Sequence, residues 1–369
     1  MKKDKKSNFE LMRILSMFFI VIYHIIYHGK MLQNSSGTIL LILQLIICIT
    51  LVHVNSFVLI TGYFQYNKSF SLKRFLQTFN AAYFYKILIS LVLGIIGIID
   101  LTGTDYLNLI NPFYIPYWFV ACYLILYALS PFLNILIKNM SQKIHRNFIL
   151  TLILCFSIAP FFSNQIVGPN NGLTVVQFII LYIIGAYLAK YPITENAHFK
   201  NFSKNKTQLL LFIGMIAFTL LNFITYNFGV TLVSSTSSTL QYIGQLITDN
   251  YIRYNFIFVL CQSICYFLWF STLNFKNKII NYISSLTLGI YLLHDNPYMQ
   301  TRIYEWFGID PMAAITSKNI FIKILLIALI IYIVGLIIEA IRQGIFKFIK
   351  KRKISQKLSE KFYKYLDNY

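Results

Sequence analysis

The sequence predicts an all-α membrane protein, a polytopic bundle of about ten transmembrane helices with both termini in the cytoplasm. Three observations predict this class. The 369 residues are 57% hydrophobic and only 12% charged, which leaves too little polar surface for a soluble protein of this length. Long apolar runs recur along the whole chain. Most basic residues lie outside these runs, in the short segments between them and at the two ends of the chain, as topology signals do in membrane proteins.

Each apolar run is a candidate span, because a helix needs about 20 residues to cross the hydrocarbon core. The predicted spans are residues 11–27, 39–64, 79–99, 118–137, 148–162, 175–189, 209–228, 256–273, 282–293 and 320–346. The ninth run is the shortest of the ten. Residues 1–346 are therefore expected to form one transmembrane domain, and residues 347–369 a basic cytoplasmic tail that lies on anionic lipid or is simply solvated.

The charge distribution orients the predicted bundle. Lys and Arg total 32 against 12 Asp and Glu, a formal net charge of +20. Counted from a cytoplasmic N-terminus, the inner turns hold most of the basic residues that lie in turns: Lys68, Lys73, Arg74, Lys138, Lys143, Arg146, Lys190, Lys200, Lys204, Lys206, Lys276 and Lys278. The outer turns hold few basic residues, in agreement with the positive-inside rule. The same placement argues against a nucleic-acid surface, so no nucleic-acid partner is expected.

Two ionisable side chains in the first predicted span, Arg13 and His24, are candidates for chemistry. A step of eleven residues on an α-helix returns to within about 20° of the same face and advances about 16 Å. The pair therefore shares one stripe, with Arg13 at the cytoplasmic mouth and His24 inside the bilayer. A snorkelling anchor would also explain Arg13, and packing would explain His24. Imidazole is nevertheless the side chain best suited to proton transfer near neutral pH.

Two neighbours flank this pair. Glu10 lies three residues before Arg13, and residues at this spacing adjoin on a helix, so the two are predicted to form an ion pair. His28 lies one turn beyond His24 and is expected at the membrane interface. Two histidines on one helix are weak grounds for a metal site, and no metal is expected.

Three further segments carry polar or aromatic residues at the ends of predicted spans. The second span ends in the sequence Thr61, Gly62 and Tyr63. The block at 118–134 begins with aromatic residues that suit a membrane interface, and the block at 289–297 places polar groups at the outer end of the ninth span. Taken singly, a helix terminus, an aromatic anchor and a capped turn would explain them.

In this order, these segments resemble those of the membrane-bound acyltransferase 3 family, and the resemblance covers nearly the whole chain. Its most specific element is the first-span pair of Arg13 and His24. The end of the second span resembles the family's SGY-like motif with Thr61 in place of Ser. The blocks at 118–134 and 289–297 look like those of Gram-positive capsule and exopolysaccharide O-acetyltransferases. The resemblance implies a multi-pass enzyme of the bacterial plasma membrane that moves an acyl group, usually acetyl, to a polysaccharide hydroxyl.

The implied donor is acetyl-CoA or another acyl-CoA, whose phosphates would be attracted to a basic cytoplasmic mouth. Arg13, Lys73 and Arg74 are the candidate phosphate contacts, with arginine preferred for its bidentate geometry. The family often carries two arginines three residues apart after the second span, whereas this chain has Arg74 followed by Gln77. Lys73 or Lys86 is the candidate replacement for the missing contact.

The implied acceptor is a cell-surface polysaccharide or its lipid-linked oligosaccharide precursor. His24 would act as the general base on the acceptor hydroxyl, or would itself carry the acyl group between two half-reactions. His294 and Asp295 are expected on the side opposite the donor, in acceptor contact or in helix capping. The candidate acceptor contacts are Tyr117, Trp118, Tyr291, His294 and Asp295.

Two other classes compete with the acyltransferase interpretation. An exporter of polysaccharide or lipid-linked sugar would also need many spans and a polar stripe, but the sequence shows no internal repeat of the kind that many transporters have. A membrane receptor or sensor would explain neither His24 nor the order of the segments. The acyltransferase interpretation accounts for both.

Overall fold

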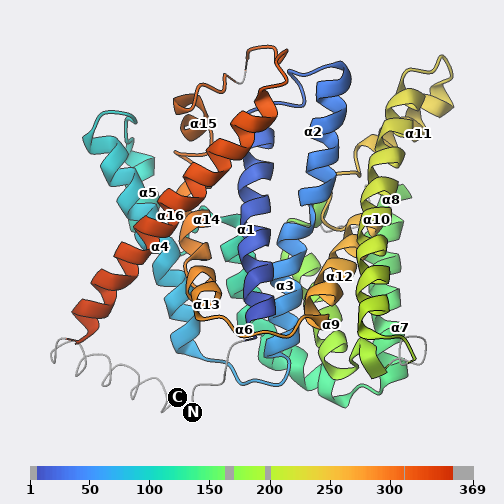
Figure 1. Cartoon of the computed structure of the whole chain (residues 1–369). Coiled ribbons are helices and arrows are strands. Elements are labelled where there is room, and N and C mark those ends of the chain that lie inside the picture. Colours follow the sequence, from blue (N-terminus) through green and yellow to red (C-terminus); the bar gives the residue numbers. More distant parts are fainter. Residues whose placement is uncertain (1–5, 163–169, 196–200, 311, 352–369) are drawn as a thin grey trace.

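The computed structural model describes residues 6–162, 170–195, 201–310 and 312–351. In these ranges the chain is built of helices and contains no strand, which confirms the all-α prediction. Figure 1 shows the helices running roughly side by side as one bundle. The beginning of α1 (Ser7–His28) and the end of α16 (Ile320–Lys351) lie at the same end of that bundle, the lower end in this view.

Six helical rods in the described part of the chain are long and apolar enough, by length and composition, to cross a membrane. They are α1, the bent rod of α2 (Gly37–Thr50) and α3 (Val52–Gln65), α4 (Leu72–Ile95), α6 (Trp118–Asn139), α10 (Lys204–Val233) and α16. Two shorter apolar helices accompany them, α9 (Val175–Lys190) and α12 (Ile257–Thr272). The ten-span count and the cytoplasmic side of the ends stay predictions.

The other two predicted spans are interrupted helices. One consists of α7 (Gln142–Ile153), the π-helical turn η1 (Leu154–Ile158) and α8 (Ala159–Phe162). The other is α13 (Lys278–Ser284) followed by α14 (Thr287–His294). The remaining short helices are α5 (Gly103–Ile110), η2 (Asn170–Gly172), η3 (Ile193–Glu195), α11 (Ser238–Thr248) and α15 (Arg302–Trp306). The predicted boundary at residue 346 falls inside α16, and the tail beyond residue 351 lies outside the described residues.

Helix α1 is the central element of the bundle. It packs against α2, α3, α12, α13, α14 and α16. Of the residues in its most apolar stretch, 61% are buried, compared with 17% in α10 at the periphery. Its polar residues have partners from other helices: the Asn8 side-chain amide donates to the Phe270 carbonyl at 2.9 Å. Because hydrocarbon offers no hydrogen-bond partner, such bonds fix where α1 sits.

Helices α3 and α9 cross with their backbones in close contact. A Cβ atom at Gly62 would overlap the backbone of Tyr182, and one at Gly185 would overlap the Leu59 carbonyl and approach the Tyr63 amide at 3.0 Å. Small residues permit this approach, which membrane helices commonly use to associate. Gly62 is the middle residue of the Thr61–Tyr63 motif, so the crossing also sets the position of Thr61.

The break between α13 and α14 faces α1. Ser284, the last residue of α13, donates its hydroxyl hydrogen to Glu10 Oε2 at 2.5 Å. Irregular backbone is tolerated at membrane depth where it is buried in protein or lines a cavity. The interrupted ninth span therefore supplies hydroxyl groups to the interior, which explains why its apolar run in the sequence is so short.

Candidate functional site

The candidate site is a cavity of about 260 Å³ that follows one face of α1. Arg13 and His24 both line it, as the shared stripe predicts. The rest of the wall comes from α3, α4, α6, α13, α14 and the segment just before α12. Its residues include Thr61, Trp118, Tyr123, Tyr254, Ser284 and Tyr291. The cavity thus extends from the cationic side chain of Arg13 to the imidazole of His24, about 16 Å further along the helix.

The hydrogen bonds of His24 determine which of its ring nitrogens is basic. His294 Nδ1 lies 2.6 Å from the Ile290 carbonyl oxygen, which can only accept, so this nitrogen carries a hydrogen. In a neutral imidazole, His294 Nε2 is then an acceptor. His24 Nδ1 lies 3.0 Å from that nitrogen and must donate to it. This network assigns the unprotonated, basic nitrogen of His24 to Nε2.

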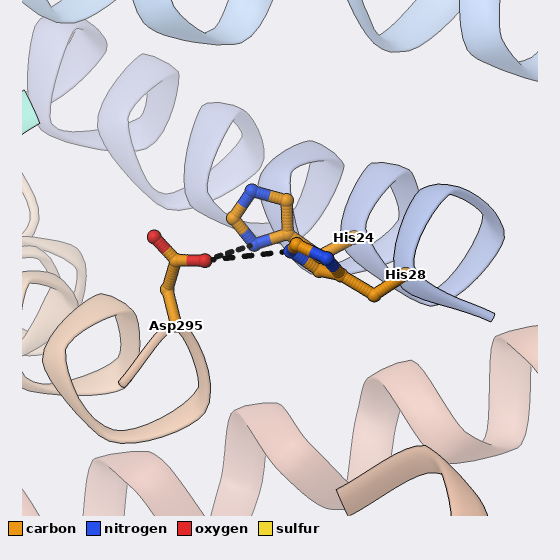
Figure 2. Close-up of side chains that lie close together, drawn as sticks. All are labelled: His24, His28 and Asp295. Carbon is orange, nitrogen blue, oxygen red and sulfur yellow. Dashed lines mark ion pairs between the residues drawn. The ribbon is translucent and has the colours of Figure 1, made fainter. Parts of the chain in front are cut away.

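Asp295 lies on the same side of His24. Its Oδ1 is 3.5 Å from His24 Nδ1 and 3.5 Å from His28 Nε2, and its side chain is 4% exposed (Figure 2). Gln300 Nε2 donates to the same oxygen at 3.2 Å. A carboxylate at this place stabilises an imidazolium and holds the ring orientation, the role that the acid has in serine hydrolase triads.

His294 and Asp295 are therefore not separate from the first-span histidine. The sequence interpretation put them in acceptor contact or in a cap on the side opposite the donor, whereas the structure buries both against His24. His24 lies 270 residues before His294 in the chain, and the packing of α14 against α1 brings the three side chains together. No local pattern in the sequence carries that contact.

The side of the His24 ring that faces Asp295 has the ligand types of a metal site. His24, His28 and Asp295 each offer one ligand atom, and these atoms lie within 4.8 Å of one another. His28 is half-buried and its ring stacks on Tyr304. A metal ion here would take the Nδ1 atom that His24 uses to donate to His294. Metal binding and this hydrogen-bond network are thus alternatives.

At Arg13, the cavity adjoins a second, smaller space of about 170 Å³. Its basic residues are Arg13, Lys68 and Arg74, and no acidic residue lines it among the described residues. Arg13 Nη1 forms the predicted ion pair with Glu10 Oε1 at 2.9 Å, which orients the guanidinium. The two spaces share Arg13, Thr61, Thr78 and Tyr123. An anion held at the basic end would thus be connected to His24.

The other predicted cations lie elsewhere. Lys73 is exposed and lines neither space. Lys86 lies about 18 Å beyond Arg74 along α4 and donates to the carbonyls of Asn108, Asn111 and Tyr114 at 2.9 to 3.0 Å. The suggestion that Lys86 replaces a phosphate contact is therefore wrong, because its ammonium group holds the segment after α5. Lys68, which the sequence interpretation used only for topology, is at the basic end instead.

The aromatic candidates also divide into two groups. Trp118 and Tyr291 line the cavity. Tyr117 does not: its buried hydroxyl donates to the Leu292 carbonyl at 2.9 Å and accepts from Asn296 Nδ2 at 3.0 Å. Tyr117 thus anchors the end of α14 that carries His294.

Sequence reasoning missed His53 and Tyr254, which both line the cavity. His53 Nδ1 donates to the Thr50 carbonyl at 2.5 Å, and its Nε2 accepts from the Tyr254 hydroxyl at 3.1 Å. The available signal was that His53 is an ionisable residue inside a predicted span, which is by default a site candidate. No such signal marked Tyr254, because tyrosine is common throughout the chain, with 27 copies.

Comparison with known proteins adds one match. A family model described as an acyltransferase domain matches residues 6–351, a range that begins just before α1 and ends with α16. No curated protein and no solved structure matches the chain. The matched range includes every residue of the cavity.

Proposed function

The chain belongs to the membrane-bound acyltransferase 3 family, and from this premise we propose that it transfers an acetyl or other acyl group from acyl-CoA to a hydroxyl. The acceptor is a cell-surface polysaccharide or its lipid-linked precursor, and the site of action is the bacterial plasma membrane. One observation supports the proposal: His24 lines the cavity, and its Nδ1 contacts His294, whose own Nδ1 donates to the Ile290 carbonyl, so we assign Nε2 as the basic nitrogen of His24.

In the proposed reaction, His24 Nε2 accepts the proton of the acceptor hydroxyl as its oxygen attacks the thioester carbon. The tetrahedral intermediate collapses, the carbon–sulfur bond breaks, and the imidazolium returns the proton to the departing thiolate. The products are the ester and free CoA. A general base of this kind supplies a rate factor of about 10² to 10⁴.

The two neighbours of His24 have complementary roles in this scheme. His294 accepts from Nδ1 and so selects the tautomer in which Nε2 is free. Asp295, 3.5 Å from Nδ1, stabilises the positive charge that the ring acquires during the transfer. Both are positioning residues, because they act through His24.

The donor enters from the basic end of the cavity. Arg13 and Arg74, with Lys68, form a cationic entrance that suits the phosphates of acyl-CoA. Arg13 lies about 16 Å from His24 along α1, too far to touch the reacting carbon, so its proposed role is to bind the donor. Trp118 and Tyr291 are the proposed acceptor contacts.

The same tautomer also permits a two-step route, in which His24 Nε2 attacks the thioester and carries the acyl group to the acceptor. Initial rates at varied donor and acceptor concentrations distinguish the routes. Parallel double-reciprocal lines indicate an acyl-histidine intermediate, and intersecting lines indicate direct transfer.

The test of the function is surface-glycan O-acetylation in cells that express the wild type or His24→Ala. We expect the modification to disappear with His24→Ala. The matched control is His145→Gln, a buried histidine that contacts the Ile183 carbonyl at 3.1 Å away from the cavity, and it should retain the modification. Wild-type modification by a correctly inserted His24→Ala protein would refute the assignment.

A further inference from the structure

A third space in the structure is a groove of about 1010 Å³ between α4 and α16. Its charged residues are Arg74, Arg342 and Lys347 against a single acid, Glu339. The groove shares Thr78, Tyr123, Ser285 and Leu288 with the catalytic cavity, so the two are continuous. A ligand in this groove would therefore have one end in a region of net positive charge and an open path toward His24.

Arg342 is held rigidly at this groove. Its Nε and Nη2 donate to the two oxygens of Glu339 at 2.7 and 2.6 Å. Glu339 is 3% exposed and also accepts from the Tyr85 hydroxyl at 2.9 Å. The guanidinium carbon lies 5.5 to 5.9 Å from the ring centroids of Phe84, Tyr85 and Phe346. Aromatic rings and a bidentate carboxylate thus fix the plane of the guanidinium before any ligand binds.

The fixed guanidinium can still bind an anion. Arginine has five N–H donors, Glu339 uses two, and the Tyr85 oxygen can accept one more. The remaining donors belong to a side chain that lines the groove. Arg74 and Lys347 add two charges that Glu339 does not balance, and Gln77 and Asn80 add amide groups. Such a set suits a phosphate ester more than a neutral sugar.

We propose that the nucleotide end of the acyl-CoA donor extends from the cationic entrance into this groove, which shares Arg74 with it, and that Arg342 contacts one of the donor's phosphates. The proposal rests on the proposed function, which supplies the donor. The pantetheine arm then passes between α4 and the break before α14, beside Ser285, and presents the thioester to His24. Arg342 is then a donor-binding residue. It lies 329 positions after Arg13, so no sequence motif could have linked the two arginines.

The experiment compares two donors that differ only in the part that the groove would hold. Acetyl-CoA carries the nucleotide and its phosphates, whereas S-acetyl-pantetheine carries neither. The main variant is Glu339→Gln/Arg342→Gln, which removes both charges together and leaves no buried carboxylate unpaired. A second variant, Lys347→Gln, changes an exposed residue and leaves the packing intact. The control, Lys323→Gln, removes one charge from the opposite end of α16.

We expect the double variant to raise the KM for acetyl-CoA about tenfold, equivalent to about 1.4 kcal/mol, with the KM for S-acetyl-pantetheine unchanged. Lys347→Gln should raise the KM for acetyl-CoA about threefold, and Lys323→Gln should leave it unchanged. An equal effect on both donors, or no effect on either, would overturn the proposal.

Binding of CoA to the purified full-length protein in detergent provides a readout that needs no acceptor. We expect the double variant to bind CoA about tenfold more weakly than the wild type. Equal binding by the variant, or no binding by the wild type, also overturns the assignment. An anionic lipid headgroup could occupy the groove instead of CoA. The double variant would then bind CoA as tightly as the wild type, but phosphatidylglycerol added to phosphatidylcholine vesicles would no longer change its transfer rate, and this result would overturn the proposal. CoA binding without any acetyl transfer by the wild type would refute the proposed function and leave the groove assignment standing.

Discussion

The chemistry proposed for His24 depends on the groups around its Nδ1 atom. In water, either ring nitrogen of histidine can hold the hydrogen. Here the Ile290 carbonyl fixes the hydrogen on His294 Nδ1, and His294 in turn fixes the hydrogen on His24 Nδ1. The geometry around one ring thus determines the protonation of the next. Asp295 adds a negative charge beside the atom that becomes positive when the base works.

Replacing Asp295 tests that arrangement. Asp295→Asn keeps the size of the side chain but removes its charge, so the imidazolium is less stable in the transition state. We expect kcat to fall about 10²-fold or more while the KM for acyl-CoA changes little, because Asp295 lies far from the cationic entrance. The control is Asp310→Asn, which caps the Met312 amide in an exposed loop. Equal kcat values for Asp295→Asn and the wild type would refute the role.

Metal ions provide a second test at the same residues. His24 Nδ1 cannot bind a metal and donate to His294 at once, so we expect chelators to leave the transfer rate unchanged. Added Zn²⁺ should inhibit, because it would occupy the atoms of His24, His28 and Asp295. His28→Ala should reduce the sensitivity to Zn²⁺, measured as the concentration that halves each protein's own metal-free rate. Loss of activity on chelation, with recovery on metal addition, would show instead that the cluster is a working metal site.

At the scale of the elements, close helix crossings hold the cavity in shape. The α3–α9 crossing relies on the hydrogen side chains of Gly62 and Gly185, and Thr61 on α3 faces the cavity beside Gly62. The break between α13 and α14 brings Ser284 to Glu10, which in turn orients Arg13. The shapes of these helices are thus tied directly to the positions of the candidate site residues.

Gly62→Ala tests the crossing. The added methyl group would overlap the Tyr182 backbone, and two helix backbones cannot move apart without loss of packing. We expect a loss of about 1 to 3 kcal/mol in the free energy of unfolding, as for other overpacked interiors. Gly103→Ala is the control, because no atom lies within 4 Å of its Cβ position. The measurement is thermal unfolding in detergent, and equal midpoints for the two variants would contradict the account.

Local sequence features predicted the long helices and the part of the site that lies on α1, Arg13 and His24. Apolar run lengths located the long helices, and helical periodicity placed Arg13 and His24 on one stripe, because both signals act within a single element. The pairing of His24 with His294 and Asp295 depends on packing between α1 and α14, and it could not be read from either segment alone. The hydrogen bonds of Lys86 and Tyr117 could not be read from the sequence either. Their partners are backbone carbonyls, which carry no residue-specific signal in the sequence.

At the scale of the whole molecule, the predicted orientation determines the side from which the donor enters. Arg13 and Arg74 lie near the beginnings of α1 and α4, and both helices begin at the end of the bundle where α16 ends (Figure 1). The positive-inside rule predicts that this end is cytoplasmic, which is where acyl-CoA is made. The acceptor, in the proposed reaction, must then meet His24 nearer to the opposite face.

Cysteine labelling tests this orientation. In a background without the five native cysteines, we expect Leu173→Cys to react with a membrane-impermeant maleimide added to intact cells. Lys204→Cys should react only after the membrane is opened. Leu173 is preferable to the adjacent Gly172, whose φ of 84° a side chain would strain. The reverse labelling pattern would invert the bundle and place the basic entrance outside the cell.

The most direct test of the central claim is acetyl transfer in inside-out membrane vesicles, supplied with labelled acetyl-CoA that cannot cross the membrane. The wild type should transfer the label to the glycan or its lipid-linked precursor, and His24→Gln should reduce the rate about 10² to 10⁴-fold with the protein fully inserted. Transfer by His24→Gln at the wild-type rate would contradict the claim that this histidine is the base of the reaction.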